Sequence, residues 1–572
     1  MSDVLRPLVS KKKFSYATFD IETKEKNSKE VLCCGFFDGE AYFYFKTIKE
    51  MVDHFLTNKY NCWTCFAHNG SGFDFGFLFD MLQQHYPQYT FRIQLIGNDL
   101  AIVKIRKSSS DHRFWTFADS LKLLPMGQAD LTKSFAVEHK KMEEVDRCNL
   151  KAVTDEELRA YNECDCRGLF EVLKKFETWF EKLGVPLRYT IASQAMATYR
   201  SMMKFCLPCL KKGEEAFIRE GYHGGRVEVY KMRCRDKLYV YDFKSLYPYI
   251  MKKYPMPFGK GFHISHFDPN KIGFYRAEIE SPETYLPSLP FFTGIKLLFP
   301  YGKFKGIYSS IELKRAVELG CDVKIKEGYV YSSKYLFDDY VDKFFKMKED
   351  AGDDQTTRAI AKLLLVSLYG KFAQNRETYE LMHSINFREF MGWEAYNEDL
   401  SLWKRKRIAL SKFIIPNIAN WITSCGRDEL FGRLLKAGEE NIYYADTDSI
   451  FTTKKLPSGN KLGNLDLQNV VDEAIFLQPK TYILKTEDKL IIKAKGFEKD
   501  FTHNLTIKAY EDALYGNPKA FMQNMRKLGK IKECIVREHS FVAVLDKKKT
   551  MQSVYDKRKV LPNLDTKALE MK

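Results

Sequence analysis

The stretch YADTDSI, residues 444–450, most constrains how this chain can fold, because it sets Asp446 and Asp448 two residues apart. Apolar and β-prone residues flank it, and residues i and i+2 of a strand point to one face. Two carboxylates a few ångströms apart repel each other unless a cation lies between them or one is protonated. A solvated turn is the alternative interpretation, since Asp-Thr-Asp also suits a β-turn.

A second stretch, YDFKSLYPYIM at residues 241–251, supplies a partner for this acidic pair. Asp242 follows an apolar run at residues 238–241 that indicates a buried strand. A strand that ends on one aspartate, beside a hairpin that carries two, is typical of a two-metal site for phosphoryl transfer. We therefore expect Asp242, Asp446 and Asp448 to meet in the folded chain.

The N-terminal part of the chain carries another acidic set. Asp20 and Glu22 alternate with an apolar residue in a strand predicted for residues 14–23, so both carboxylates project to one side. Asp74 stands at the start of a helix predicted for residues 73–84, where a carboxylate could serve only as a cap. The order of the three favours metal ligation.

A long helix is predicted further along. Thr154 and Glu157 form a capping box, and the helix should continue to about residue 182. Tyr161 and Asp165 are four residues apart and therefore share one helical face. A helix that presents a phenol and a carboxylate together can orient a water and hold a metal, although a surface Tyr–Asp pair is the plain alternative.

Six motifs, taken in order, resemble those of family B DNA polymerases. DFKSLYP and YADTDS are similar to the first and third polymerase motifs, and AKLLLVSLYGKFA, residues 361–373, is similar to the fingers motif. FDIET, HNGSGFDFGFL and YNECD resemble the three motifs of a proofreading 3′–5′ exonuclease. The resemblance implies an α/β and α+β multidomain chain, in which a right-hand polymerase of palm, fingers and thumb follows an RNase H-like exonuclease domain.

The resemblance also implies roles for the exonuclease residues. Asp20, Glu22, Asp74 and Asp165 would hold two divalent ions, with the catalytic Tyr161 beside them. Four residues separate Asn69 from Asp74 where members of the family carry three, which could move Asn69. The residues expected to bind the frayed 3′ end of the DNA are Asn69, Phe73, Ser120, Leu121 and Lys141.

For the polymerase site, the resemblance implies a second pair of ions. Asp242, the backbone carbonyl of Phe243 and Asp448 would hold two magnesium ions, with Asp446 supporting the site. Manganese would serve as a substitute. Tyr247 would form the floor of the sugar pocket and block a 2′-hydroxyl.

The fingers motif can be interpreted from its spacing. Arg358, Lys362 and Tyr369 are separated by 4 and 7 residues and so share one helical face. Two cations one turn apart suit a triphosphate, and the tyrosine can stack on a base pair. A basic amphipathic helix is the alternative. Val366 stands where the family has an asparagine, so we expect retained polymerisation with altered nucleotide affinity.

Further residues are expected to contact DNA. Tyr222, Gly224, Gly225 and Arg226 resemble the Y-x-G-G motif between the two halves of the family. Paired glycines let a backbone approach DNA closely, and Arg226 would meet a phosphate; a plain Gly-Gly turn is the alternative. The residues expected to hold the primer terminus and the duplex are Lys480, Tyr482, Lys493 and Lys495.

The motif order sets the expected domain organisation. The long spacing between Asp242 and Lys362, and the stretch at residues 300–320, resemble the protein-primed branch of the family, found in linear plasmids and small tailed phages. That branch implies a terminal protein as primer, high processivity and strand displacement. The expected parts are an exonuclease domain at 1–185 and a polymerase domain at 186–572, with palm at about 186–257 and 411–498, a terminal-protein-type insertion at 258–345, fingers at 346–374, a second insertion of irregular segments at 375–410, a thumb at 499–555 and a loose tail at 556–572.

Composition agrees with a nucleic-acid partner. The formal charge is +16, and 33 Tyr and 44 Phe offer rings on which bases can stack. We expect DNA template, primer and deoxynucleoside triphosphates as partners of a monomer. No apolar run near 18 residues and no signal peptide are present, so a membrane is not expected and the location is the host cytoplasm.

Two C-x-x-C pairs, Cys62/Cys65 and Cys206/Cys209, could be half-sites for zinc. No second pair follows at the spacing of a zinc finger, so reduced thiols packed in the core are the better interpretation.

Three rival functions remain open on the sequence. One is a family B polymerase that uses ordinary nucleic-acid primers, and another is a non-catalytic DNA-binding scaffold with a decayed polymerase fold. A reverse transcriptase is disfavoured, because those enzymes favour two adjacent aspartates and Thr447 separates the pair here.

Overall fold

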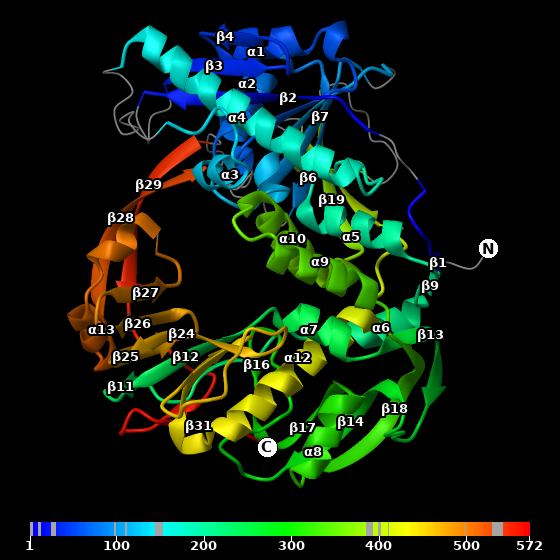
Figure 1. The fold of residues 1–572 in the computed structure, drawn as a ribbon, viewed down its shortest axis with the longest axis vertical. Coiled ribbons are helices and arrows are strands. Elements are labelled where there is room, and N and C mark those ends of the chain that lie inside the picture. Colours follow the sequence, from blue (N-terminus) through cyan, green and yellow to red (C-terminus); the bar gives the residue numbers. More distant parts are fainter. Residues whose placement is uncertain are drawn as a thin grey trace.

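The computed structural model describes residues 4–9, 13–24, 30–96, 99–108, 111–142, 153–384, 393–397, 402–409, 411–497, 499–528 and 542–572. Figure 1 shows the N-terminal part of the chain, in blue and cyan, above the rest of the molecule. The helices α9 (Asp338–Asp350) and α10 (Gln355–Ser367) lie between the two parts. The paired strands β28 (Lys519–Leu528) and β29 (Val542–Met551) rise at the left toward the upper part.

The upper part is built on a ten-stranded sheet of order β20-β21-β19-β6-β7-β8-β5-β2-β3-β4. Its central strands β2, β5 and β8 run parallel, and the long helix α4 packs against β2 and β3. The capping box at Thr154 and Glu157 is present as predicted. The bounds are β2 Tyr16–Thr23, β3 Val31–Phe37, β4 Tyr42–Phe45, β5 Thr64–Ala67, β6 Thr90–Ile96, β7 Asp99–Arg106, β8 Trp115–Asp119 and α4 Asp155–Glu181.

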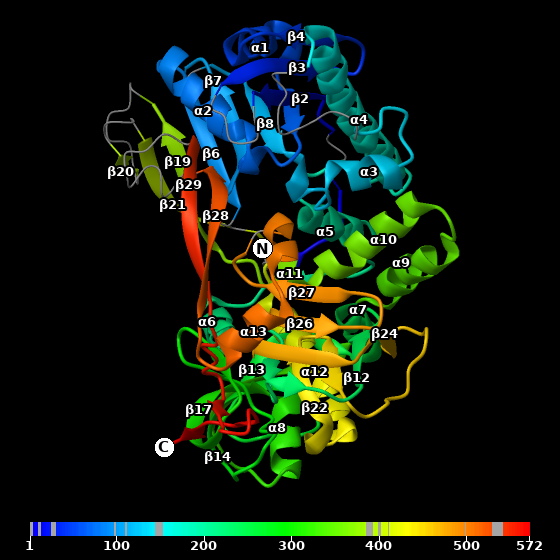
Figure 2. The ribbon, with the colours of Figure 1, turned by 90° about the vertical axis from the view of Figure 1, so that its left-hand side faces the viewer.

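Three strands of this sheet come from far along the chain. They are β19 Glu377–His383, β20 Glu394–Asn397 and β21 Leu402–Ile408, and β19 pairs antiparallel with β6 (Figure 2). Leu381 and Leu402 are buried in the core of the upper part. The expectation of irregular structure at 375–410 is therefore wrong for these strands; residues 385–392, 398–401 and 410 lie outside the described residues. Local composition does not reveal a strand whose partner is almost 300 residues away.

The lower part centres on a five-stranded sheet of order β10-β22-β23-β12-β24. The helices α7 and α12 pack together beside it, and α12 is buried along most of its length. A four-stranded sheet, β11-β25-β26-β27, adjoins it. The bounds are β10 Val227–Val229, β11 Arg233–Cys234, β12 Leu238–Phe243, α7 Leu246–Lys253, α12 Pro416–Ala437, β22 Ile442–Asp446, β23 Ser449–Thr452, β24 Leu465–Val471, β25 Glu473–Gln478, β26 Thr481–Lys485 and β27 Leu490–Ala494.

The remaining elements form three groups around this sheet. One is a separate five-stranded sheet with its helix, one is a set of helices, and one is a helix with a long hairpin. The bounds are β13 Met256–Ile264, β14 Ile272–Ser281, β17 Tyr301–Ser309, α8 Ser310–Glu318 and β18 Asp322–Lys334; α9 Asp338–Asp350, α10 Gln355–Ser367 and α11 Tyr369–Phe372; α13 Ile507–Leu514, β28 Lys519–Leu528 and β29 Val542–Met551.

The C-terminal segment is not a loose tail, contrary to the prediction for 556–572. Its last strand, β32 Glu570–Met571, pairs parallel with β17. Arg558 is 1% exposed and lies 3.6 Å from the buried carboxylate of Glu228. The hydroxyl of Thr566 donates to the carbonyl of Val229 at 3.0 Å. This basic, polar segment is held in place because the Arg558 guanidinium and the Thr566 hydroxyl both have partners in the palm.

Two further findings concern the whole chain. None of the helices that the structure describes is apolar over a length that would cross a bilayer. Cys62 and Cys206 are exposed while Cys65 is buried, and the clusters of metal-ligating side chains found among the described residues contain no cysteine.

Replacing Arg558 by alanine should destabilise the lower part. Glu228 would keep Arg226 as its partner but would lose one of two buried cations, and breaking a buried ion pair costs about 3–5 kcal/mol. We expect a lower midpoint of urea denaturation, followed by tryptophan fluorescence. Lys559→Ala, at an exposed neighbour, is the matched control. Equal midpoints for the two variants would contradict this assignment.

Candidate active sites

The three aspartates of the lower part meet at one end of the palm sheet. Asp446 ends β22, Asp448 lies in the turn to β23, and Asp242 lies on β12 opposite Ser449 of β23. The amide of Phe243 donates to the carbonyl of Asp448 at 2.8 Å, which fixes the two segments together. The acidic pair therefore lies on a turn as well as in the cluster. Thr447, between Asp446 and Asp448, adopts a φ of 59°, and its amide donates to the carbonyl of Arg226.

Burial and then mutual repulsion disfavour the charged forms of Asp242 and Asp448 in this cluster. Burial, with Asp448 and Asp466 nearby, raises the pKa of Asp242 to about 7. Burial and then Asp446 raise the pKa of Asp448. The ammonium of Lys480 lies 3.5 Å from Asp446 and offsets only part of this negative charge. Oxygen donors that are crowded and poorly neutralised are what a hard divalent cation binds.

One acidic residue at this site was not predicted from the sequence. Asp466 on β24 lies directly opposite Asp242 in the antiparallel register, so the two side chains share a face. The signal that could have found it is the single carboxylate in the apolar alternation LDL, residues 465–467, just after the hairpin. Tyr444 was also missed; its hydroxyl donates to Asp446 at 3.1 Å and accepts from the Lys480 amide.

The fingers helices face these carboxylates with cations. Lys362 on α10 is close enough to Asp242 to lower the pKa of that carboxyl. Lys348 on α9, which the sequence analysis missed, has a lowered pKa because it is partly buried and lies near Arg358 and Lys362. Positive side chains gathered from two helices can bind a polyphosphate.

The predicted fingers residues lie on two successive helices. α10, with Arg358 and Lys362, ends at Ser367, and Tyr369 begins the short helix α11. The Tyr369 ring centroid lies 4.3 Å from that of Tyr247, so the two tyrosines form one aromatic wall. Val366 is 46% exposed at this place and offers no polar group.

Arg226 was expected to meet a phosphate, and the structure contradicts this. Its side chain is 1% exposed, and its Nε donates to Glu228 Oε2 at 2.6 Å. Another nitrogen donates to the carbonyl of Pro287 at 2.8 Å. The guanidinium therefore neutralises a buried carboxylate and joins the palm to the first insertion; the motif pattern could not distinguish this from a surface role.

Gly225, next to Arg226, has to be a glycine for a structural reason. A Cβ on Gly225 would lie 2.7 Å from the Thr447 side chain, so a glycine lets this segment approach the acidic turn of the palm. The carbonyls of His223 and Gly224 accept from Arg427. Tyr222 is half-buried beside them.

The residues expected to hold the primer lie next to the acidic cluster. Lys480 has a φ of 62° and leads into β26, where Tyr482 lies opposite Lys493 of β27. The Tyr482 ring centroid is 5.5 Å from that of Tyr444. The amide of Lys495 donates to Thr481 Oγ1 at 3.3 Å. A further lysine, missed from the sequence, is Lys557, whose pKa burial lowers and whose Nζ donates to the Val227 carbonyl.

The upper part brings together three of its four predicted carboxylates. Oxygens of Asp20 and Glu22 on β2 and of Asp165 on α4 lie within 4.8 Å of one another. Burial and then Asp165 raise the pKa of Asp20 to about 6; burial and Asp20 raise that of Glu22. Asp74 is outside this group of three. Its buried carboxylate accepts from the Ile21 amide at 3.1 Å, between the two acids of β2.

Lys141 was expected to bind single-stranded DNA, but the structure places it among the carboxylates. Its ammonium pairs with Asp165 and lies 5.4 Å from the ring centroid of Tyr161. Tyr161 is buried, and its pKa is raised to about 12 by burial and by Asp165. Asn162, missed from the sequence, donates to Asp20 Oδ2 at 3.2 Å and accepts from the Tyr42 hydroxyl.

The loops beside this site come from the ends of β5 and β8. Asn69 is exposed with a φ of 60°, and Phe73 and Leu121 are half-buried. Ser120 is fully buried and donates to the Ala67 carbonyl at 3.0 Å, so its hydroxyl holds the loop and does not face DNA as expected. Asp119, missed from the sequence, accepts from the amides at residues 70, 71 and 121.

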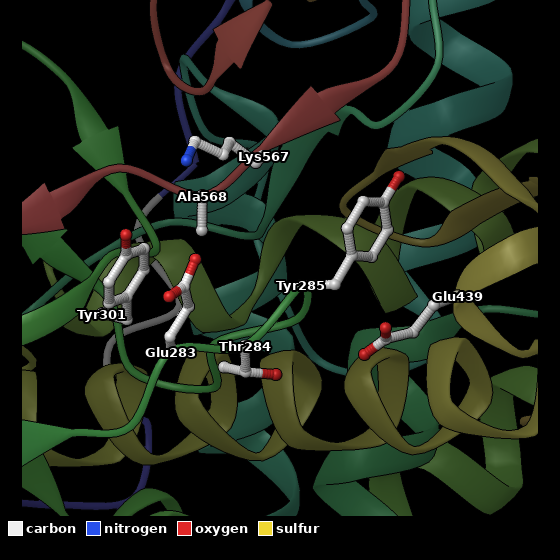
Figure 3. Close-up of a pocket in the computed structure, with 7 residues that line it drawn as sticks. All are labelled: Glu283, Thr284, Tyr285, Tyr301, Glu439, Lys567 and Ala568. Carbon is white, nitrogen blue, oxygen red and sulfur yellow. The ribbon is translucent and has the colours of Figure 1, made fainter. Parts of the chain in front are cut away.

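A pocket of about 460 Å³ lies apart from both acidic sites. Figure 3 shows its lining side chains, which come from the first insertion, the turn after α12 and the C-terminal segment: Glu283, Thr284, Tyr285, Tyr301, Glu439, Lys567 and Ala568. None of them was predicted as a site residue, so cavity size alone does not find the acidic sites.

Comparison with known proteins links this geometry to a family. A sequence model described as "DNA polymerase type B, organellar and viral" matches residues 133–389. A probable DNA polymerase of Ascobolus immersus is 25% identical over 551 residues, covering 82% of this chain and 45% of that one. The DNA-directed DNA polymerase of Enterobacteria phage PRD1 is 28% identical, covering 86% and 87%. The chain therefore spans less than half of the fungal relative's length but most of the phage one.

The solved structures show the same fold. Phi29 DNA polymerase in complex with primer-template DNA and incoming nucleotide superposes with a TM-score of 0.74 at 19% identity, covering 94% of this chain and all of that one. The predicted class, an exonuclease unit followed by palm, fingers and thumb, is thereby confirmed.

Metal affinity at both sites should depend on pH. Asp242 and Asp20, with pKa values raised to about 7 and about 6, are partly protonated in neutral and mildly acidic solution. An incoming ion must displace these protons, so affinity should rise as pH increases from about 5.5 to about 8. Calorimetric titration with magnesium at several pH values measures this. Affinity that is flat across this range would contradict the crowding of the carboxylates.

Proposed function

Because the chain belongs to the type B DNA polymerases of the organellar and viral class, we propose that it extends DNA primers on a DNA template. In this reaction a 3′-hydroxyl attacks a deoxynucleoside triphosphate, and pyrophosphate leaves. The observation that carries the proposal is the meeting of Asp242, Asp446 and Asp448 opposite the cations of α9 and α10.

The residues of the polymerase site have different proposed roles. Asp242, Asp448 and the Phe243 carbonyl would hold two divalent ions, magnesium or manganese, which stabilise charge on the attacking and leaving oxygens. Lys362, with Arg358 and Lys348, binds and orients the triphosphate. Tyr247 and Tyr369 form a wall against the sugar and the base pair.

The primer and duplex are held from the other side of the acidic cluster. Lys480 and Tyr482 position the primer terminus beside Asp446. Lys493, Lys495 and the newly found Lys557 follow on the same side, where they neutralise phosphates of the duplex.

We also propose that the upper site trims mismatched 3′ ends. Asp20, Glu22, Asp74 and Asp165 would hold the divalent ions for hydrolysis of the terminal phosphodiester. Lys141 fixes Asp165 and Asn162 fixes Asp20, so both carboxylates are oriented before DNA arrives. The exposed Asn69 and the half-buried Phe73 and Leu121 would contact the frayed strand.

The wider biological role is inferred from the relatives. We propose a phage- or plasmid-type replicase, working as a monomer in the host cytoplasm, that is processive, displaces a strand and starts from a terminal protein. The likeness to phage polymerases and the two insertions after the first and second polymerase motifs support this. Use of ordinary primers is the alternative.

Two substitutions should separate the two activities. Asp448→Ala should lower primer extension on the order of 10³-fold and leave trimming intact, because the lost carboxylate belongs to one metal site only. Asp20→Ala should do the reverse. Extension of labelled primers with magnesium and degradation of labelled single strands measure both rates. Asp322→Ala, exposed on the first insertion, is the control. Wild-type protein without either activity would favour a non-catalytic scaffold.

Priming can be tested with the same variant. With labelled dATP and candidate terminal proteins, the wild type should transfer dAMP to a protein hydroxyl and Asp448→Ala should not. Label that appears only on oligonucleotide primers would contradict protein priming and favour an ordinary replicase.

A further inference from the structure

The hairpin β19–β21, which follows the fingers in the chain, is a structural part of the exonuclease sheet. β19 pairs with β6 over four residues, and His383 stacks on Phe91 with ring centroids 5.0 Å apart. Leu381 and Leu402 are buried in the core below. The ladder and the buried leucines fix the position of this hairpin relative to the exonuclease carboxylates.

The hairpin ends at the side of the sheet where the carboxyl ends of the parallel strands β2, β5 and β8 lie, which carries the exonuclease site and is called the edge below. Ala67 ends β5 beside Asp119 of β8, and Ile96 ends β6 beside Asp99 of β7. β19 runs antiparallel to β6, so its first residue and the last residue of β21, Ile408, lie at this same edge. The loops with Asn69, Phe73 and Leu121 leave from this edge as well, since they follow β5 and β8.

The strand pairings also define which side chains share a face. Residues directly opposite in register point to the same side, and so does every second residue along a strand. One continuous row of such partners is Thr18, Phe66, Ala118, Ile102, Gln94, Glu380 and Arg405. Asp20 lies two residues after Thr18 and Arg407 lies two after Arg405, so the acid and the cation share this face.

Arg407 differs from its basic neighbours in having no carboxylate partner. Arg405 pairs with Glu380 at 2.7 Å, and Lys406 pairs with Glu377 at 2.8 Å. Arg407 is exposed, and within the described residues its guanidinium forms no ion pair. An exposed guanidinium without a carboxylate partner suits a phosphate of the DNA backbone.

We propose that Arg407 forms the outer contact for the single-stranded DNA whose 3′ end is trimmed at Asp20, Glu22 and Asp165. The inference rests on the exonuclease function proposed above. Six strand spacings of about 4.8 Å separate β2 from β21, so the contact lies about 29 Å from the carboxylates along the sheet. The strand would follow the twisted edge of the sheet past Phe73 and Leu121. The hairpin from the polymerase half thus completes the exonuclease's binding surface.

The test compares single strands of different length. Arg407→Ala should weaken binding of strands of about 16 nucleotides by about two- to fivefold, the effect of one exposed charge pair. The slope of the logarithm of the binding constant against the logarithm of the salt concentration should become less steep by about 0.7, as for one lost phosphate contact. Strands of about 4 nucleotides should bind unchanged, because they do not reach β21. Fluorescence anisotropy in EDTA measures binding without cleavage, and degradation with magnesium gives the matching rates.

The control removes the same charge from the same face of the sheet. Arg92 is exposed on β6 opposite Met382 and lies away from the edge, so Arg92→Ala should leave all strand lengths unaffected. Arg407→Lys should restore most of the binding. Equal loss in both alanine variants, or no length dependence, would overturn the proposal. A loss in primer extension with unchanged binding of 3′ ends would assign Arg407 to the template strand instead.

Failure of this inference is distinguishable from failure of the proposed exonuclease. If wild-type protein does not degrade single strands, the exonuclease function itself is refuted. If wild type degrades them but Arg407→Ala behaves as wild type at every length, only the outer contact is refuted.

Discussion

Repulsion between buried carboxylates is the constraint on which the rest of this structure depends. Burial raises the pKa of Asp20, Glu22 and Asp74 in the upper site and of Asp242 and Asp448 in the palm. Gathering like charges away from water costs folding free energy, so the surrounding scaffold must fix their positions. It does so with β2 and β12, the strands that carry Asp20, Glu22 and Asp242, because each is paired on both sides.

The sequence could predict what a single segment determines. The capping box at Thr154 and the pairing of Asp20 with Glu22 on one strand depend only on local spacing, and both are present. The convergence of three aspartates followed from two strand-like motifs. Arg226 could not be predicted in this way, because the buried group of charges that it forms with Glu228 includes Arg558, which is 330 residues away from Glu228 in the sequence.

Motifs identify functional positions better than they identify what a side chain touches. Lys141 and Ser120 occupy positions where DNA contacts were expected, yet Lys141 pairs with Asp165 and Ser120 holds the Ala67 carbonyl. Both still serve the site, since they orient a carboxylate and a loop. Asp466 was missed because it belongs to no motif, and Asn162 because only Tyr161 and Asp165 of its motif YNECD were given roles. Strand register brings Asp466 to the acids, and a side-chain hydrogen bond links Asn162 to Asp20.

The boundary between the two sets of sequence motifs does not coincide with the boundary between the hydrophobic cores. A boundary near residue 185 separates the exonuclease motifs from the polymerase motifs, but Leu381 and Leu402 lie in the core of the upper part. Without β19, strand β6 would present unpaired backbone groups at an open edge, which favours aggregation. The segment after the fingers is therefore a structural member of the upper part, although it stands between two polymerase motifs in the sequence.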